Sequence, residues 1–209
     1  MHHQDDEGMD SMTTPPCIYL SGPAGSGKTE VARLLEERHG FARVSLGDLC
    51  REEAARRGVP AHRATLQAMG DLLRATDPAR LAVLAWARAK TIRGSLVIEG
   101  VRLRAEATYL RARGVIGVSV EAPAEVRDAR LLVRDGSSRV PQHRTEREAG
   151  GLLTDIHLRN DGDRQALERA VRMLVGRATL LHVQQSTAHR GGRPAPARRR
   201  LRETAGIER

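Results

Sequence analysis

The chain has 209 residues, of which 40% are hydrophobic but only 2% aromatic, and its formal net charge is +9 at pH 7. This length suits one α/β domain with short extensions, and the scarcity of aromatic rings means that aliphatic side chains must build the core. The sequence has no apolar run near the ~18 residues that a membrane-spanning helix needs, so we expect no membrane association.

Two terminal segments differ in composition from the rest. Residues 1–14 are polar and acidic, without the pattern of a secretory signal, and we expect them to be disordered. Residues 188–209 are rich in Arg, Gly and Pro, and we expect a disordered basic tail. A solvated tail is favoured over one that binds nucleic acid, and we expect nucleic acid nowhere else on the chain. The two cysteines have neither metal-ligand nor disulfide spacing, which favours a cytoplasmic location.

Between these segments, in residues 15–187, strand patterns alternate with helix patterns. Short apolar runs predict strands at 17–21, 41–46, 95–99, 115–120 and 155–158. Apolar periodicity and end signals predict helices at 27–39, 47–57, 63–76, 78–93, 103–113, 123–134 and 163–181. The alternation predicts one α/β domain with a parallel sheet of about five strands and helices on both faces. In such sheets, ligands bind beyond the carboxyl ends of the strands.

Residues 22–29 read Gly-Pro-Ala-Gly-Ser-Gly-Lys-Thr and fit the phosphate-loop pattern G-x-x-x-x-G-K-[ST] between a strand and a helix. The glycines allow a tight loop whose backbone N–H groups surround phosphate oxygens, and the following helix adds its positive end. We expect Lys28 to neutralise the β- and γ-phosphates and the Thr29 hydroxyl to bind Mg²⁺. The predicted cofactors are ATP and Mg²⁺, and the predicted nucleotide contacts are Gly22, Pro23, Ala24, Gly25, Ser26, Gly27, Lys28, Thr29 and Glu30.

Lys28 also stands out by composition. The chain has 35 Lys and Arg residues, and only Lys28 and Lys90 are lysines. A lysine within the phosphate loop therefore indicates that this position requires a compact ammonium group and not merely a positive charge.

The stretch Gly-Asp-Leu-Cys-Arg at residues 47–51 follows the second predicted strand. It is similar to the Thr-Gly-Asp-x-x-Arg stretch of adenylate kinases and their relatives. The resemblance implies that Arg51 binds the phosphate of an acceptor, and that Asp48 lies near this acceptor or near the water shell of Mg²⁺. Read without the resemblance, Asp48 equally suits a helix N-cap and Arg51 an exposed helical arginine.

The stretch Glu-Gly-Val-Arg at residues 99–102 ends the third predicted strand. Nucleoside monophosphate kinases carry an acidic residue, a glycine and soon an arginine there. The resemblance implies that Glu99 acts on Mg²⁺ through water, and that Gly100 and Arg102 contact the acceptor. A carboxylate at the end of a buried apolar strand is costly unless it is used, which supports this interpretation. The spacing looks closer to phage-type deoxynucleoside monophosphate kinases and to small P-loop kinase-like ATPases than to adenylate kinase.

The stretch at residues 130–139, Arg-Leu-Leu-Val-Arg-Asp-Gly-Ser-Ser-Arg, opens a polar, basic segment predicted to be a short mobile lid over about residues 134–151. It is similar to the start of the lid of uridylate and cytidylate kinases. The resemblance implies that Arg134 and Arg139 contact the transferring phosphoryl group, with Arg130 in reserve. The Asp-Asp pair that usually follows is absent, and a solvated basic loop is the alternative.

Other polar candidates lie elsewhere along the chain. Relatives with an Asn-x-Gly turn place it beside the adenine of the donor, which would give Asn160 and Gly162 that role, although the stretch is also an ordinary turn. Within the helices predicted over residues 47–93, Gln67 and Arg74 are the polar groups that we expect to face the acceptor.

In sum, residues 16–180 resemble the P-loop nucleoside and deoxynucleoside monophosphate kinases. The resemblance implies a three-layer P-loop NTPase sandwich and transfer of the γ-phosphoryl group of ATP to a small phosphate-bearing acceptor, a nucleotide or deoxynucleotide. Dephospho-coenzyme A kinase, which phosphorylates a hydroxyl, is an alternative of the same architecture. A P-loop ATPase or switch without a small acceptor is an alternative of a different class.

Overall fold

A parallel sheet lies at the centre of the computed structural model, which describes residues 15–135 and 151–191. Its five strands are β1 (Cys17–Ser21), β2 (Ala42–Ser45), β3 (Leu96–Glu99), β4 (Ile116–Glu121) and β5 (Ile156–Arg159). Neighbouring strands are parallel throughout, and their order across the sheet is β2-β3-β1-β4-β5. The predicted α/β fold with a parallel sheet of about five strands is confirmed.

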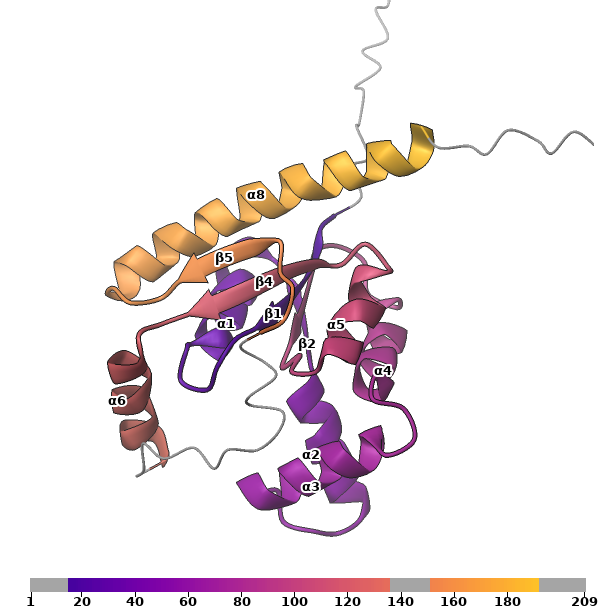
Figure 1. Ribbon diagram of the computed structural model, residues 1–209, viewed down its shortest axis with the longest axis vertical. Coiled ribbons are helices and arrows are strands. Elements are labelled where there is room, and N and C mark those ends of the chain that lie inside the picture. The colour runs from indigo at the N-terminus through magenta and orange to yellow at the C-terminus, as the bar shows by residue number, and fades with distance from the viewer. Residues whose placement is uncertain (1–14, 136–150, 192–209) are drawn as a thin grey trace, which may run out of the picture.

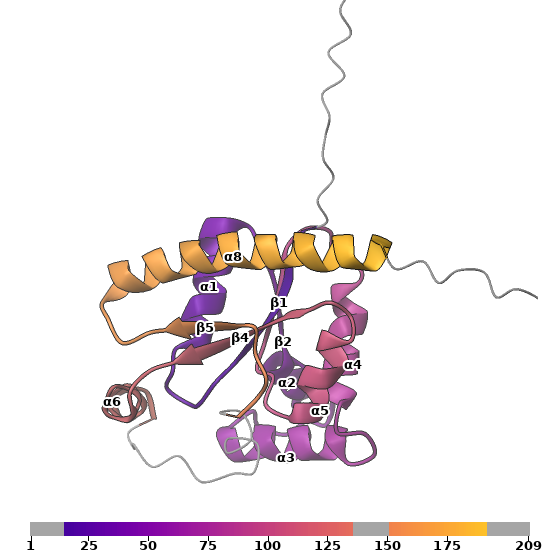
Figure 2. The ribbon, with the colours of Figure 1, turned by 45° about the horizontal axis from the view of Figure 1, so that its top comes forward.

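Helices cover both faces of this sheet (Figures 1 and 2). They are α1 (Lys28–His39), α2 (Leu46–Arg56), α3 (Arg63–Arg74), α4 (Arg80–Ala89), α5 (Arg104–Arg111), α6 (Ala124–Asp135) and α8 (Arg164–Gly191). Apolar residues of α1 and α8 form one core cluster with the sheet, and those of α2, α4 and α5 form another. The predicted three-layer sandwich is therefore present.

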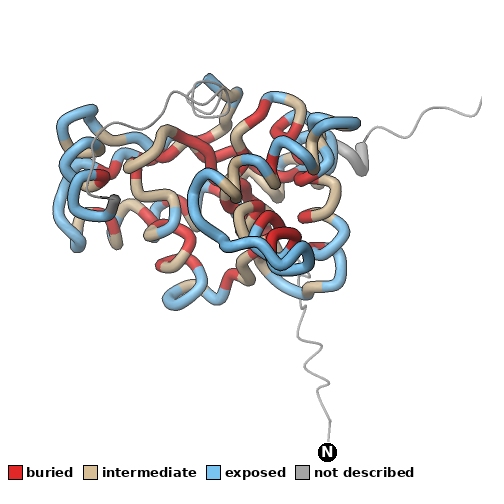
Figure 3. Tube along the Cα trace, turned by 90° about the horizontal axis from the view of Figure 1, so that it is seen from below, coloured by how far each residue is buried: buried red, intermediate tan, exposed pale blue. Residues whose placement is uncertain are grey.

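The core follows from the alternation of side chains along the strands. In β1, Ile18 and Leu20 belong to the cluster with α1 and α8, whereas Tyr19 between them belongs to the opposite cluster. Successive strand residues point to opposite faces, so a strand covered on both sides is apolar along most of its length. Figure 3 shows the resulting buried interior, with exposed turns around it.

The final helix is longer than the sequence pattern predicts. We expected a helix over residues 163–181 and a disordered tail from residue 188, but α8 continues to Gly191. The expectation is wrong for residues 188–191, because no proline and no paired glycine interrupts the chain before Gly191-Gly192. Residues 1–14, 136–150 and 192–209, which include most of the expected lid, lie outside the described part of the chain. Within the described part, no helix is both long enough and apolar enough to cross a membrane.

The register of the sheet brings the motifs together. Glu99, the last residue of β3, lies level with Leu20 of β1 and with Ser45 of β2. The three segments that follow these strands therefore leave the sheet at the same edge. Figure 1 shows α2 and α3 together beyond this edge, in contact with each other. The end of β1 with the phosphate loop, the end of β3 with Glu99, and helices α2 and α3 therefore lie at the same edge of the sheet.

Candidate active site

The phosphate loop is a turn of residues 22–27 between β1 and α1 whose shape depends on its glycines. Gly27, the N-cap of α1, has a φ of 95°, and a Cβ there would lie 2.1 Å from Asn160 Nδ2. Gly22 has a φ of 130°, and a Cβ there would lie 2.2 Å from the carbonyl oxygen of Val120. Both positions need a backbone that only glycine adopts readily, and both lack room for any side chain. The sequence pattern is therefore realised as a loop packed closely against β4 and the start of the last connection.

Asn160 supports this loop from behind. The residue is 5% exposed, and its Nδ2 donates a hydrogen bond to the Ser26 carbonyl at 2.8 Å. Arg130 Nη2 donates to the Asn160 carbonyl at 3.1 Å and so ties helix α6 to the same point. Among the described residues, neither Asn160 nor Gly162 lines the cleft described below. The structure thus places Asn160 against the phosphate loop, and the role beside the adenine of the donor that the resemblance implies for it stays a prediction.

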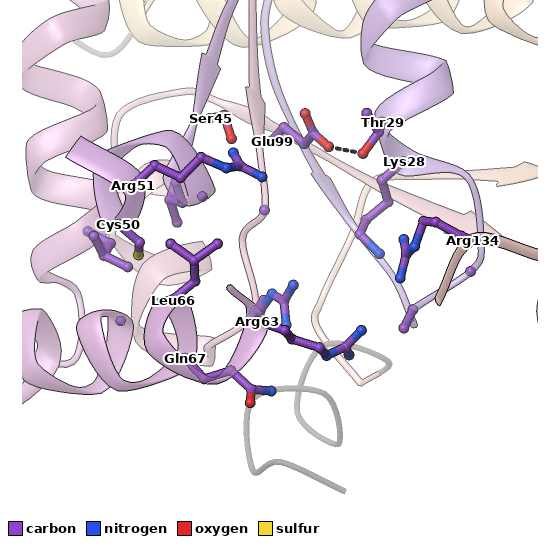
Figure 4. Close-up of a pocket in the computed structure, with 18 of the residues that line it drawn as sticks. Lys28, Thr29, Ser45, Cys50, Arg51, Arg63, Leu66, Gln67, Glu99 and Arg134 are labelled. Atoms are coloured by element: carbon purple, nitrogen blue, oxygen red, sulfur yellow. Dashed lines mark hydrogen bonds between the residues drawn. The ribbon is translucent and has the colours of Figure 1, made fainter. Parts of the chain in front are cut away.

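Lys28 and Thr29, the first two residues of α1, form hydrogen bonds to specific partners. Lys28 Nζ donates hydrogen bonds to the carbonyl oxygens of Gly22 and Pro23, each at 2.8 Å. The Thr29 hydroxyl donates to Glu99 Oε1, which connects the start of α1 to the end of β3 (Figure 4). A hydroxyl and a carboxylate side by side are the oxygen ligands that suit Mg²⁺, bound directly or through water. The chemistry of this pair therefore fits the predicted metal ion.

Glu99 has a second partner, which the sequence did not reveal. The Glu99 side chain is 9% exposed, and Arg43 donates to Glu99 Oε2 from Nε and Nη2, each at 2.9 Å. Arg43 lies on β2 beside Val97 of β3, two positions before Glu99, so both side chains emerge on the same face of the sheet. The pairing keeps a nearly buried negative charge compensated at the carboxyl edge of the sheet.

A cleft of about 690 Å³ opens between the phosphate loop and helices α2 and α3. Figure 4 shows Lys28 and Thr29 on one side of it and Arg51, Leu66 and Gln67 on the other. Its wall carries an excess of positive charge: the basic residues are Lys28, Arg43, Arg51, Arg63, Arg74, Arg102, Arg130 and Arg134, and the acidic residues are Glu30 and Glu99. A concave site with such an excess favours anionic ligands, because its walls focus the positive potential.

Arg51 and Asp48 lie together at the start of α2. Arg51 Nη1 donates to Asp48 Oδ1, and both side chains are about half exposed, at 55% and 47%. Ser45 is the N-cap of α2, and its Oγ accepts a hydrogen bond from the Asp48 backbone N–H at 3.3 Å. The alternative interpretation of Asp48 as the N-cap is therefore wrong. Arg51 lines the cleft, and its pairing with an exposed carboxylate is weak enough to be exchanged for a phosphate.

Deeper on the same side, Arg74 of α3 is held by a residue that sequence reasoning missed. Arg74 donates to Glu106 Oε1 from Nε and Nη2, each at 2.8 Å, and the Glu106 side chain is fully buried. Glu106 Oε2 accepts from the backbone N–H groups of Arg102 and Leu103 at 2.9 and 3.1 Å. The signal that could have found Glu106 is its place three residues after the N-cap Leu103, where a capping glutamate reaches back to the backbone.

Two groups in the cleft have perturbed titration. Burial raises the pKa of the Cys50 thiol above its ordinary value and outweighs the opposing charge of nearby Arg74. The pKa of Glu30 is lowered, chiefly by hydrogen bonds from Arg33 on the next turn of α1. Cys50 is therefore a neutral thiol at pH 7, whereas Glu30 is ionised and already paired.

Most of the predicted site residues converge on this cleft. Those that line it are Ala24, Gly25, Gly27, Lys28, Thr29, Glu30, Arg51, Gln67, Arg74, Glu99, Gly100, Arg102, Arg130 and Arg134. Gly22, Pro23 and Ser26 shape the phosphate loop from within, and Asp48 meets the cleft only through Arg51. Arg139 lies outside the described residues. Arg43 and Arg63 line the cleft without having been predicted.

Several known proteins are similar to this chain in sequence. The AAA domain family matches residues 18–150. A UPF0200 protein of Pyrococcus horikoshii is 37% identical over 128 residues, which cover 57% of this chain and 68% of that protein. A cytidylate kinase of Methanococcoides burtonii is 36% identical over 148 residues, which cover 67% of this chain and 77% of that protein.

Solved structures show the same fold. A gluconokinase from Sinorhizobium meliloti superposes with a TM-score of 0.51 at 19% identity. The match covers 83% of this chain and 98% of the gluconokinase chain. A putative kinase from Chloroflexus aurantiacus gives a TM-score of 0.52 at 19% identity, covering 80% of this chain and 99% of its own. At this level of identity, the likeness concerns the arrangement of strands and helices alone.

Proposed function

This chain belongs to the AAA domain family and to the P-loop kinase-like proteins, and from this premise we propose that it phosphorylates a nucleoside monophosphate with ATP. The observation that carries the proposal is the cleft with a phosphate-binding group at each side. Lys28 lies on the phosphate-loop side and Arg51 on the side of α2 (Figure 4), and Arg102, three residues after the end of β3, also lines the cleft. A simple hydrolase needs the first group but not the second.

On the donor side, the loop amides and the N-terminus of α1 would bind the phosphates of ATP. Lys28 would exchange its two carbonyl partners for β- and γ-phosphate oxygens, which are stronger acceptors because they are charged. Thr29 and Glu99 would hold Mg²⁺, which, when bound, neutralises charge between the β- and γ-phosphates.

On the acceptor side, Arg51 and Arg102 would bind the monophosphate, with Asp48 releasing Arg51 as the phosphate arrives. An acceptor phosphate oxygen would attack the γ-phosphorus of ATP, the bond from that phosphorus to the bridging oxygen would break, and ADP would leave. Gln67 of α3 is the polar group that we assign to the remainder of the acceptor. Catalysis of this kind consists of positioning and charge stabilisation, so no dedicated general base is required.

Arginines near the end of α6 add positive charge to the cleft beside the phosphate loop. Arg130 and Arg134 line the cleft beside the phosphate loop, and we assign them to the transferring phosphoryl group together with Arg139. Planar guanidinium groups suit this task because they can bind two phosphate oxygens at once. The similarity to a protein named cytidylate kinase places cytidine and deoxycytidine monophosphates first among the acceptors to be tested.

The proposal is tested by measuring ADP release from ATP and Mg²⁺ with a panel of nucleoside and deoxynucleoside monophosphates. We expect at least one monophosphate to raise the rate well above hydrolysis in its absence, and a diphosphate product to appear in equal amount. Dephospho-coenzyme A belongs in the same panel, because stimulation by it alone would favour phosphorylation of a hydroxyl. Hydrolysis that no acceptor stimulates would contradict the kinase assignment and favour an ATPase or switch.

A further inference from the structure

A buried carboxylate joins two elements on the acceptor side of the cleft. Glu106 in the first turn of α5 is fully buried, and each of its oxygens serves a different element. Oε1 accepts from Arg74 at the end of α3, whereas Oε2 accepts from the backbone N–H of Arg102 and of the following residue. Both Arg74 and Arg102 line the cleft. One carboxylate thus fixes two cationic residues of the acceptor side relative to each other.

Among the described residues, the guanidinium of Arg74 is held along one edge. Nε and Nη2 contact Glu106 Oε1, and Nη1, on the other edge, lies over Gly70 one helical turn earlier. A Cβ on Gly70 would lie 2.8 Å from Nη1. Gly70 is in the interior of α3 and does not have a positive φ, so its backbone conformation does not require glycine. What it provides is space for the guanidinium.

A glycine inside a helix and a charge buried in the interior both lower stability. Glycine is among the weakest helix formers, and a buried ion pair gains little net free energy after the loss of hydration. The two features occur at the same place and both act on the position of Arg74. Their shared effect is orientation, because an arginine anchored by two nitrogens presents its third nitrogen in a fixed direction.

We propose that Glu106 is a positioning residue for the acceptor, which acts by holding Arg74 and the Arg102 loop in place, and that Gly70 leaves the room in which Arg74 presents Nη1 to an acceptor oxygen. The proposal rests on the proposed function and adds to it the groups that orient the acceptor. The oxygen that Nη1 meets is either a phosphate oxygen or a carbonyl of the base, since both accept hydrogen bonds from a guanidinium.

The sharpest test is Gly70→Ala. Alanine is the better helix former, and the atom that must move is the end of a side chain, so we expect the melting temperature to stay level or rise. Displacing Nη1 should nevertheless raise the KM for the acceptor by ~10-fold, the order expected for losing a hydrogen bond to a charged group, with the KM for ATP unchanged. Stability and acceptor affinity would then move in opposite directions, which a merely structural role does not allow.

Glu106→Gln tests whether the buried carboxylate positions Arg74, and Glu53→Gln is its matched control. Glu53 is also buried, at 7% exposure, and is also paired with two arginines, Arg56 and Arg57, but it does not line the cleft. Both variants should lower the melting temperature. Only Glu106→Gln should raise the KM for the acceptor, again without a change in the KM for ATP. Combined with Gly70→Ala, it should add only the part of its effect that comes from the Arg102 loop, because both changes displace Arg74.

The outcomes separate the two claims. If the wild type shows no acceptor-stimulated turnover, the proposed function fails and this inference fails with it. If the wild type is stimulated but Gly70→Ala leaves the acceptor KM unchanged, or raises both KM values in parallel, only the inference is overturned. An increase in KM that is equal for all nucleobases assigns Nη1 to the phosphate. An increase that is absent for adenine, which has no carbonyl group, assigns it to the base, and either pattern supports the proposal.

Discussion

The two sides of the cleft are built in different ways. On the donor side, a contiguous loop is shaped by its own backbone: Gly22 and Gly27 adopt positive φ values, and Lys28 contacts the carbonyls of its own loop. On the acceptor side, the geometry depends on ion pairs between elements far apart in sequence, such as Arg74 with Glu106. Backbone geometry is fixed before a ligand arrives, whereas some of the acceptor-side pairs can exchange partners. The donor side therefore resembles a preformed anion site, whereas the acceptor side combines a buried, fixed pair, Arg74 with Glu106, and an exposed pair, Arg51 with Asp48, that a ligand can rearrange.

The largest expected effect comes from the donor side. Lys28→Ala should abolish turnover, because it removes the cation that stabilises charge on the transferring phosphoryl group, at a cost of at least ~3 kcal/mol in the barrier. The rate of ADP release with a saturating acceptor measures this. Lys90→Ala is the control, since Lys90 is the other lysine of the chain and is exposed at the C-cap of α4. Activity near the wild-type level in Lys28→Ala would mean that the site is elsewhere.

Gly27→Ala should give the second largest effect and tests whether the donor side is fixed by its backbone. The new residue would have to adopt the left-handed region, at about 1–2 kcal/mol, and its Cβ would displace Asn160 from the Ser26 carbonyl. We expect a lower melting temperature and a higher KM for ATP.

Gly40→Ala is the control for Gly27→Ala. Gly40 also has a positive φ, 67°, but among the described residues no atom lies within 4 Å of a Cβ built there. It should lose stability without any change in the KM for ATP. If the two alanine variants behaved alike, close packing against Asn160 would have no part in holding the phosphate loop.

The contrast between the two sides also explains what the sequence could predict. The strands and the phosphate loop were recognisable because their signals are local: an apolar run, or eight consecutive residues in a fixed pattern. Arg43 was not recognisable, because its pairing with Glu99 arises from the register between β2 and β3. Glu106 was read only as part of a helix, and its connection to Arg74 spans 32 positions. Single residues that act across elements give no contiguous motif, so their partners emerge only from the fold.

Arg51→Ala tests the acceptor side of the cleft and should have an intermediate effect on acceptor kinetics. Losing a charged contact with the acceptor phosphate costs about 1.5–3 kcal/mol, so the KM for the acceptor should rise by ~10- to 100-fold while the KM for ATP stays constant. The control is Arg88→Ala, which removes another exposed arginine that is paired with a carboxylate of α2, Glu52, but does not line the cleft. Unchanged acceptor kinetics in Arg51→Ala would remove this residue from the site.

The smallest expected effect is on the reactivity of Cys50, which lines the acceptor side of the cleft. Burial raises the pKa of its thiol, and only the thiolate reacts with alkylating reagents, so alkylation at pH 7 should be slow and should accelerate as the pH rises beyond the ordinary thiol range. A bound acceptor should slow it several-fold further, whereas ATP alone should not. Cys17 provides an internal control, because burial also raises the pKa of its thiol but it begins β1 and does not line the cleft. Peptide mass spectrometry after timed alkylation measures the modification of both cysteines in one sample. If the acceptor protected Cys17 and Cys50 to the same extent, it would be stabilising the whole fold and not occupying the side of the cleft formed by α2 and α3.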